Sequence, residues 1–246
     1  MQKDNLAFIF PGQGSQKVGM LKELAETYPT VGQTFGEASE ALGYDMWDLL
    51  QHGQQEDINL TERTQPMLLA ASVAIWRIWS ERQGPVPAYL AGHSLGEWSA
   101  LVASGVVAFE DAVKLVKMRG TFMQEAVPFG QGAMAAVIGV EDDLIRQICR
   151  QVAGDEVVSP VNYNSPGQVV IAGDAAAVER AIEGLKAAGA KRPMLLPVSA
   201  PFNTSLMRPA ADNLAEHVHN TVFKSPAIPV VHNVHARTET DPAAIK

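Results

Sequence analysis

The alternation of apolar and polar positions along the chain predicts helices and strands that follow one another from end to end. Leu6–Phe10 is a short apolar run that predicts a buried strand, and a Pro-Gly pair ends it. Apolar positions cover much of the circumference of a helix predicted from Thr64, as its N-cap, to Arg82, so we expect this helix to be buried. A strand over Ala88–Ala91, a tight turn over Gly92–Gly96 and a helix over Glu97–Ser104 follow. Further helices are predicted over 19–28, 31–42, 110–127 and 204–220, and a further strand over 228–231.

The order of elements changes after a glycine-rich stretch at Pro128–Gly132. Strand, helix, strand, strand, helix and strand are predicted in this order over 133–138, 142–151, 157–162, 168–172, 174–188 and 194–198. This β-α-β-β-α-β order is typical of a ferredoxin-like fold. We therefore expect an α/β protein in which a small subdomain, residues 129–197, is inserted into a larger domain formed by residues 1–128 and 198–246.

Composition narrows the class of protein further. Of the 246 residues, 47% are hydrophobic and 19% charged, which favours a globular chain with a sizeable core over a disordered one. The longest largely apolar run, Met67–Trp76, is far shorter than the ~18 residues of a membrane-spanning helix, and the first residues lack a signal-peptide pattern. The net charge of −8 disfavours nonspecific nucleic-acid binding, and the single cysteine, Cys149, excludes an internal disulfide. No Cys/His set has zinc spacing, so we expect a cytoplasmic enzyme or binding domain with no metal, no membrane partner and no nucleic-acid partner.

The segment Gly92–Gly96, GHSLG, fits the G-x-S-x-G pattern between a predicted strand and a predicted helix. Glycines on both sides leave room for a strained turn, and the N-terminus of the helix favours negative charge that develops on a bound oxygen. Ser94 is therefore a candidate nucleophile, and the backbone N–H of Leu95 is a candidate oxyanion donor. The alternative is that Ser94 only caps the helix, which is a common role for serine.

Two other segments could contribute to the same site. The turn Phe10–Gln16, FPGQGSQ, lacks the lysine of a P-loop, and by itself it could be an ordinary β-to-α turn. If it leaves the same edge of a parallel sheet as Gly92–Gly96, however, the two loops can form one oxyanion hole. Arg119 lies in a helix with apolar periodicity. A solvated arginine is the ordinary interpretation, whereas a buried one needs a partner, and a substrate carboxylate suits its forked geometry.

Together these segments resemble the malonyl-CoA:acyl carrier protein transacylases of bacterial type II fatty-acid synthesis. The similarity lies in FPGQGSQ, AGHSLGE, the MRG of Arg119, MAAVIG, PVNYNSPGQVVIAG and PVSAPFNTSLM, which occur in the family's order over essentially the whole chain. It implies an α/β-hydrolase-like large domain with a parallel sheet and a ferredoxin-like insert, no cofactor, and malonyl-CoA and acyl carrier protein as partners. It also implies that Ser94 takes malonyl from CoA and passes it to the carrier's phosphopantetheine thiol. By the same resemblance, the N–H groups of Gln13 and Leu95 form the oxyanion hole, and Arg119 pairs with the free malonyl carboxylate.

The sequence departs from the family pattern at one catalytic position. Where the resemblance implies a histidine acting as general base, this chain has Asn203. An amide has no titratable lone pair near neutral pH, so Asn203 predicts an impaired transferase that still binds malonyl-CoA. Three explanations stay open: a deliberate His→Asn substitution, which the match of the surrounding motif to an active enzyme favours, a naturally inactive relative, or another base recruited nearby. Only His93 adjoins Ser94 in sequence, and its side chain is expected to point away from the Ser94 hydroxyl.

Other functions remain as alternatives. A serine esterase or thioesterase would use Ser94 without needing Arg119, and a non-catalytic module that binds acyl carrier protein would be compatible with Asn203. Since acyl carrier proteins are acidic, docking on a chain of net charge −8 needs a local basic patch. The candidates for this patch are Lys114, Lys117, Lys191 and Arg192. The ordinary interpretation of each is a solvated surface residue with no docking role. The family continues for several dozen residues past position 246, so the large domain is expected to lack its C-terminal portion.

Overall fold

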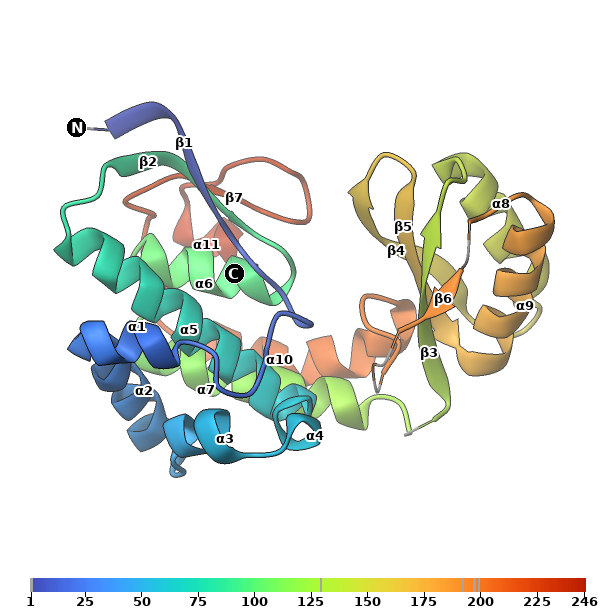
Figure 1. The fold of residues 1–246 in the computed structure, drawn as a ribbon. Coiled ribbons are helices and arrows are strands. Elements are labelled where there is room, and N and C mark those ends of the chain that lie inside the picture. The colour runs from blue at the N-terminus through green and yellow to red at the C-terminus, as the bar shows by residue number, and fades with distance from the viewer. Residues whose placement is uncertain (1, 129, 192, 197, 199) are drawn as a thin grey trace. The chain divides into compact units, whose positions relative to one another are not determined.

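The computed structural model of the chain describes residues 2–128, 130–191, 193–196, 198 and 200–246. Contacts divide the chain into two compact units (Figure 1). The first unit comprises Met1–Gly120 and Leu214–Lys246, and the second comprises Thr121–Asn213. The second unit is therefore inserted, in sequence, between the two parts of the first.

A parallel sheet forms the centre of the first unit. Its strands β1 (Gln2–Phe10), β2 (Val86–Gly92) and β7 (Val230–Val231) lie in the order β1-β2-β7. The register pairs Phe10 with Gly92, so β1 and β2 end side by side. The two glycine-rich loops that follow these strands consequently leave the same edge of the sheet, as the formation of one shared site requires.

Helices of the first unit share one buried core with this sheet (Figure 1). They are α1 (Lys22–Thr27), α2 (Pro29–Leu42), α3 (Met46–His52), α4 (Gln55–Ile58), α5 (Thr61–Glu81), α6 (Leu95–Ala103) and α11 (Pro242–Ile245), with the part of α7 (Phe109–Glu125) up to Gly120 and the part of α10 (Arg208–Asn220) from Leu214 onward. The sequence pattern missed α3 and α4, because each is only one or two turns long and is fixed by the burial of single side chains such as Leu50 and Ile58. The buried helix predicted over this stretch is confirmed as α5, although it starts earlier than predicted.

Two expectations for the first unit are wrong. The helix does not start with Thr64 as its cap; it begins at Thr61, and the Thr64 hydroxyl donates back to the carbonyl of Ile58 at 2.5 Å. The strand Leu6–Phe10 is not buried as a whole, since Ile9 is 77% exposed while Phe10 is 4% exposed. Side chains alternate between the faces of a strand, and Tyr89 of β2 is exposed on the same face of the sheet as Ile9. An apolar run alone could not distinguish a strand buried on both faces from one buried on a single face.

The second unit contains an antiparallel sheet with two helices on one face. Its elements are β3 (Gly132–Ile138), α8 (Asp142–Ala153), β4 (Val158–Ser165), β5 (Gln168–Asp174), α9 (Ala175–Ala187), β6 (Met194–Leu195) and the short 3-10 helix η1 (Ser205–Met207). The strand order is β4-β5-β3-β6, which is the ferredoxin-like arrangement that the order of elements predicted. Alternate residues of β5 face two different cores, because Val169 packs with α8 and α9 whereas Val170 packs with Phe202. The predicted α/β class, with a parallel sheet and a ferredoxin-like insert, is confirmed.

Candidate active site at the Ser94 turn

The turn between β2 and α6 holds Ser94 in a strained conformation. Its φ of 52° and ψ of −105° are values that a residue with a side chain rarely adopts. The glycines on either side are required by close packing: a Cβ on Gly92 would lie 1.9 Å from the carbonyl carbon of Gly96, and one on Gly96 would lie 2.1 Å from the carbonyl oxygen of Phe10. The spacing G-x-S-x-G therefore reflects a turn that only glycines permit, pressed against the end of β1.

The hydroxyl of Ser94 does not cap the helix. Although Ser94 occupies the N-cap position of α6, its side chain forms no capping hydrogen bond. Instead its Oγ accepts a hydrogen bond from Arg119 Nη2 at 3.1 Å. Nothing in the described part of the chain accepts a hydrogen bond from the backbone N–H of Leu95 or of Gln13. The turn thus combines a presented hydroxyl with backbone donors that are free to bind an oxygen.

A chain of side-chain hydrogen bonds links this hydroxyl to the neighbouring loop. Arg119 Nη1 donates to Gln65 Oε1 at 2.7 Å, and Gln65 Nε2 lies 3.5 Å from Gln13 Oε1. Gln13 Nε2 in turn donates to Thr61 Oγ1 at 3.3 Å. The side chain of Gln65 on α5 is fully buried, and its single amide group contacts both Arg119 and Gln13. Gln65 therefore holds these two side chains in place.

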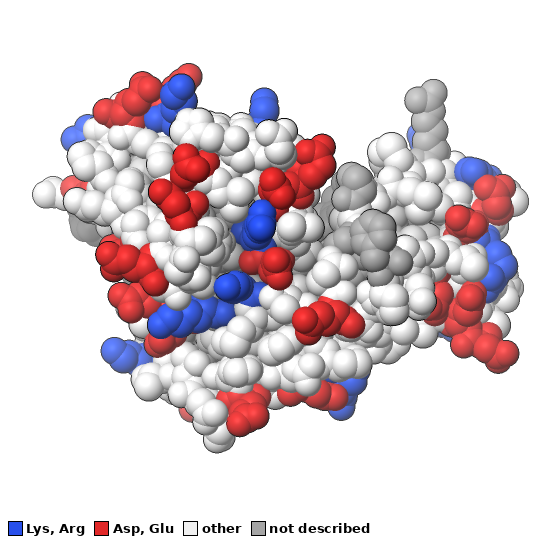
Figure 2. All heavy atoms as spheres, turned by 90° about the horizontal axis from the view of Figure 1, so that it is seen from below, with Lys and Arg blue, Asp and Glu red and all other residues white. Residues whose placement is uncertain are grey.

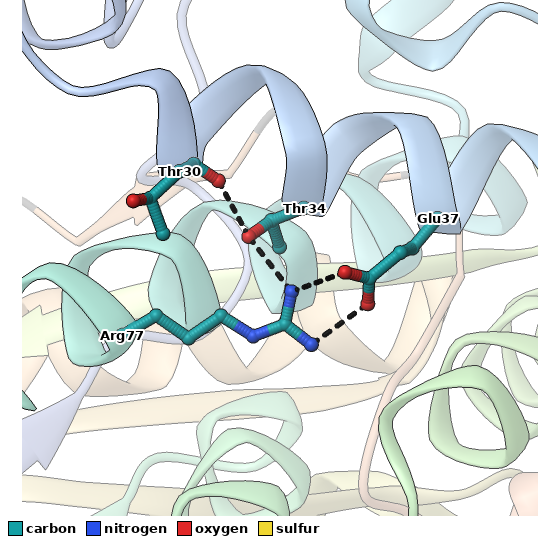
Figure 3. A network of polar contacts seen from close by, with 4 residues as sticks. All are labelled: Thr30, Thr34, Glu37 and Arg77. Atoms are coloured by element: carbon teal, nitrogen blue, oxygen red, sulfur yellow. Dashed lines mark hydrogen bonds and ion pairs between the residues drawn. The ribbon is translucent and has the colours of Figure 1, made fainter. Parts of the chain in front are cut away.

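Arg119 carries a charge that no carboxylate of the described residues neutralises through an ion pair. Burial lowers the pKa of Arg119 to about 10, an effect that the charge of Glu97 partly offsets, so the guanidinium remains a cation at neutral pH. Arg77 on α5 shows the contrast: its nitrogens donate to both carboxylate oxygens of Glu37 at 2.8 and 2.7 Å and to Thr34 Oγ1 at 3.0 Å (Figure 3). One arginine is thus paired with a carboxylate within the fold, whereas the other has no carboxylate partner among the described residues.

Asn203 belongs to the second unit. It is exposed, has a φ of 63°, follows the buried Phe202, and donates from Nδ2 to Asn162 Oδ1 at 2.8 Å. Asparagine and histidine are both enriched in this left-handed region, so the same backbone suits either residue. Two other residues of the PVSAPFNTSLM motif, Pro197 and Ser199, lie outside the described residues. The position of Asn203 as the equivalent of a catalytic base stays a prediction.

Known proteins that are similar to this chain in sequence and fold point to one family. Residues 7–244 match the family model described as an acyl transferase domain. The chain is 60% identical over 240 residues to the malonyl CoA-acyl carrier protein transacylase of Salmonella typhimurium. The matched region covers 98% of this chain and 78% of that relative. The chain belongs to the malonyl-CoA:acyl carrier protein transacylase family. The resemblance inferred from the motifs is confirmed, and with it the assignment to the acyltransferases.

Solved structures of the transacylase family have the same fold. An acyl carrier protein S-malonyltransferase from Vibrio cholerae is 60% identical with a TM-score of 0.95, covering 97% of this chain and 78% of that one. A malonyl-transacylase solved in complex with a type II polyketide synthase acyl-carrier protein is 56% identical with a TM-score of 0.96, covering 97% of this chain and 77% of that one. The fold of this transacylase-family chain is therefore the one its sequence relatives adopt.

Several residues around the transacylase-family turn were not found by sequence reasoning. Gln65 is predicted only as part of a buried helix, and Asn233 lies beyond the last predicted strand, 228–231. Asn233 Oδ1 accepts from the N–H of Ser94 at 2.8 Å across 139 residues of sequence. Glu97 accepts from the N–H of Asn233 at 3.0 Å and lies 2.7 Å from His232 Nδ1. Of these, only Glu97 carried a local signal, as a charged residue in the motif AGHSLGE.

The described surface carries charges of both signs. Figure 2 shows acidic and basic side chains interspersed over the face that it presents. Arg192 lies outside the described residues, and a docking role for Lys114, Lys117 and Lys191 stays a prediction. Within the described ranges, no group of three or more His, Cys, Asp and Glu residues could hold a metal ion. No helix in that part of the chain is long and apolar enough to cross a membrane.

Proposed function

We propose that this chain transfers a malonyl group from malonyl-CoA to the phosphopantetheine thiol of acyl carrier protein, through an ester on Ser94. The observation that carries the proposal is the pairing of Ser94 Oγ with Arg119 Nη2 at 3.1 Å, in a site where the arginine has no carboxylate partner among the described residues. A malonyl thioester has a carbonyl to be attacked and a free carboxylate to be held. The Ser94 hydroxyl and the Arg119 cation match these two groups.

In this mechanism the side chains act in sequence. Arg119 binds the malonyl carboxylate and places the thioester carbonyl at Ser94 Oγ, while the N–H groups of Leu95 and Gln13 bind the oxygen that becomes negative. The bond from Ser94 Oγ to the malonyl carbonyl carbon forms as the C–S bond to CoA breaks, and CoA leaves as the thiol with the proton that Ser94 gives up. The carrier's thiol then attacks the ester, its sulfur takes the malonyl group, and its proton returns to Ser94 Oγ. Water reacts poorly because it is not positioned as a thiol acceptor is.

Asn203 leaves this mechanism without the base that the family pattern supplies. The Ser94 proton must leave Oγ as the ester forms, and an amide cannot take it. General bases contribute about 10²–10⁴-fold to rate, so we expect slow acylation by the chain as it stands. The acceptor is a free thiol, which persists in a reducing compartment, and we accordingly propose a cytoplasmic location.

The test measures malonyl-CoA loading by intact mass on the chain and on its Asn203→His variant, with Ser94→Ala as the control that removes the acceptor. We expect a malonyl adduct on Ser94 in both proteins, formed at least about 10² times faster in Asn203→His. Transfer from the adduct to acyl carrier protein should follow in the histidine variant. Absence of a Ser94 adduct from both proteins would refute the proposed function and favour a non-catalytic module that binds acyl carrier protein.

A serine esterase or thioesterase is the second candidate, because the Ser94 turn by itself suits either chemistry. Hydrolysis of the malonyl ester faster than its transfer to acyl carrier protein in the Asn203→His variant would favour that candidate.

A further inference from the structure

The loop that follows β7 reaches the Ser94 turn from a distant part of the sequence. Asn233 Oδ1 accepts from the backbone N–H of Ser94 at 2.8 Å, and its Nδ2 donates to the carbonyl oxygen of Gly92 at 2.7 Å. The two ends of one side-chain amide therefore bind the two backbone groups that flank His93. Asn233, which lies outside the turn in sequence, thus links the backbone on both sides of His93.

Asn233 is in turn fixed to the helix that the turn begins. Its own N–H donates to Glu97 Oε2 at 3.0 Å, and Glu97 Oε1 lies 2.7 Å from Nδ1 of the preceding His232. The side chains of His232 and Glu97 are only 12% and 20% exposed, so this pair is shielded from water. The loop itself is closed, because the N–H of His232 donates to the carbonyl of Arg237 at 2.9 Å. Asn233 thus has little freedom to move away from the turn.

We propose that Asn233 is a positioning residue for Ser94: its amide holds the strained turn in the conformation that presents Ser94 Oγ. This inference rests on the proposed function, in which Ser94 Oγ is the acylated atom. The backbone of Ser94, at φ 52°, is a conformation that the surrounding structure must impose. Asn233 also occupies the N–H of Ser94, which leaves the N–H of Leu95 as the donor that this turn offers to the oxyanion.

The experiment compares Asn233→Ala, Asn233→Asp and a matched control, Asn220→Ala, which removes the same amide from the exposed last residue of α10. Each is made in the chain and in its Asn203→His variant. The first readout is the rate constant and the KM for formation of the Ser94 malonyl adduct. The second is hydrogen exchange of the Ser94 amide by NMR, which does not depend on activity, and thermal unfolding reports the folded fraction.

We expect Asn233→Ala to lower the acylation rate constant about 10²-fold with KM for malonyl-CoA within about twofold, since displacement of a reacting group by ~1 Å has an effect of this size. The Ser94 amide should exchange at least about tenfold faster in Asn233→Ala and stay protected in Asn233→Asp, which keeps the acceptor oxygen. Asn220→Ala should change neither readout.

Two results would overturn the inference: unchanged protection of the Ser94 amide in Asn233→Ala, or a loss of acylation that only follows the unfolded fraction or a higher KM. If the Asn203→His variant with intact Asn233 forms no adduct, the proposed function fails instead. The exchange of the Ser94 amide then decides by itself whether Asn233 holds the turn.

Discussion

Removal of Arg119 should abolish the preference for malonyl over acetyl without abolishing acylation as such. Arg119→Ala takes away the cation that is proposed to bind the malonyl carboxylate. Loss of one partner from a desolvated, hydrogen-bonded charge pair costs about 2–5 kcal/mol. Arg119 is partly exposed, which favours the lower part of that range, about 2–3 kcal/mol. At about 1.36 kcal/mol per tenfold, malonyl acylation should fall about 30- to 150-fold in kcat/KM.

The ratio of malonyl to acetyl loading is the quantity to measure. Arg119 also donates to Ser94 Oγ, so its removal changes the reactivity of the serine toward every acyl group. That effect, like the effect of Asn203, applies equally to malonyl-CoA and acetyl-CoA and cancels in the ratio. Timed intact-mass measurements with each thioester give both rates on the same protein, and Ser94→Ala shows that the adduct lies on the serine.

Arg77→Ala is the matched control, because it removes an arginine whose charge is already paired with Glu37 (Figure 3). That pair is partly exposed, so its loss should cost no more than about 1 kcal/mol of stability and leave the malonyl preference unchanged. An equal loss of malonyl and acetyl loading in Arg119→Ala would refute the carboxylate role. A ratio that falls equally in Arg77→Ala would show that the effect is not specific to the site.

Two further predictions concern the surroundings of the same cation. Gln65→Glu puts a carboxylate where Arg119 Nη1 now donates to an amide oxygen at 2.7 Å, so it should compete with malonyl and lower malonyl loading about tenfold or more, with acetyl loading nearly unchanged. Gln65→Met is its neutral control, and a smaller malonyl-specific loss in Gln65→Glu than in Gln65→Met would contradict the reasoning. Because burial lowers the pKa of Arg119 to about 10, the cation is lost as pH rises through that value. The malonyl-to-acetyl ratio should therefore be flat from about pH 6 to 9 and fall above about 10, and a decline centred near pH 7 would assign the preference to another group.

Local sequence determined the parts of the site whose constraints are local. The glycines at 92 and 96 predicted a tight turn because no side chain fits there, and the contacts of Gly96 with Phe10 show why. The order of elements after Gly132 predicted the ferredoxin-like insert, since that order nearly fixes how such strands pair. Apolar periodicity predicted a buried helix at α5 and a helix at α7, although it did not show which polar residues of α5 face the site.

The tertiary structure alone decided which polar groups meet. Nothing in the sequence near Gln65 distinguishes it from a residue that fills a core, and its role depends on α5 and α7 lying side by side at the Ser94 turn. The partner of the Ser94 N–H lies 139 residues away, at Asn233, beyond the whole second unit. The motif resemblance named Arg119, but the pattern of its own helix does not show that its cation lacks a carboxylate partner among the described residues or that it donates to Ser94 Oγ. Hydrophobic periodicity is a property of one element, whereas these hydrogen bonds exist only after several elements have packed together.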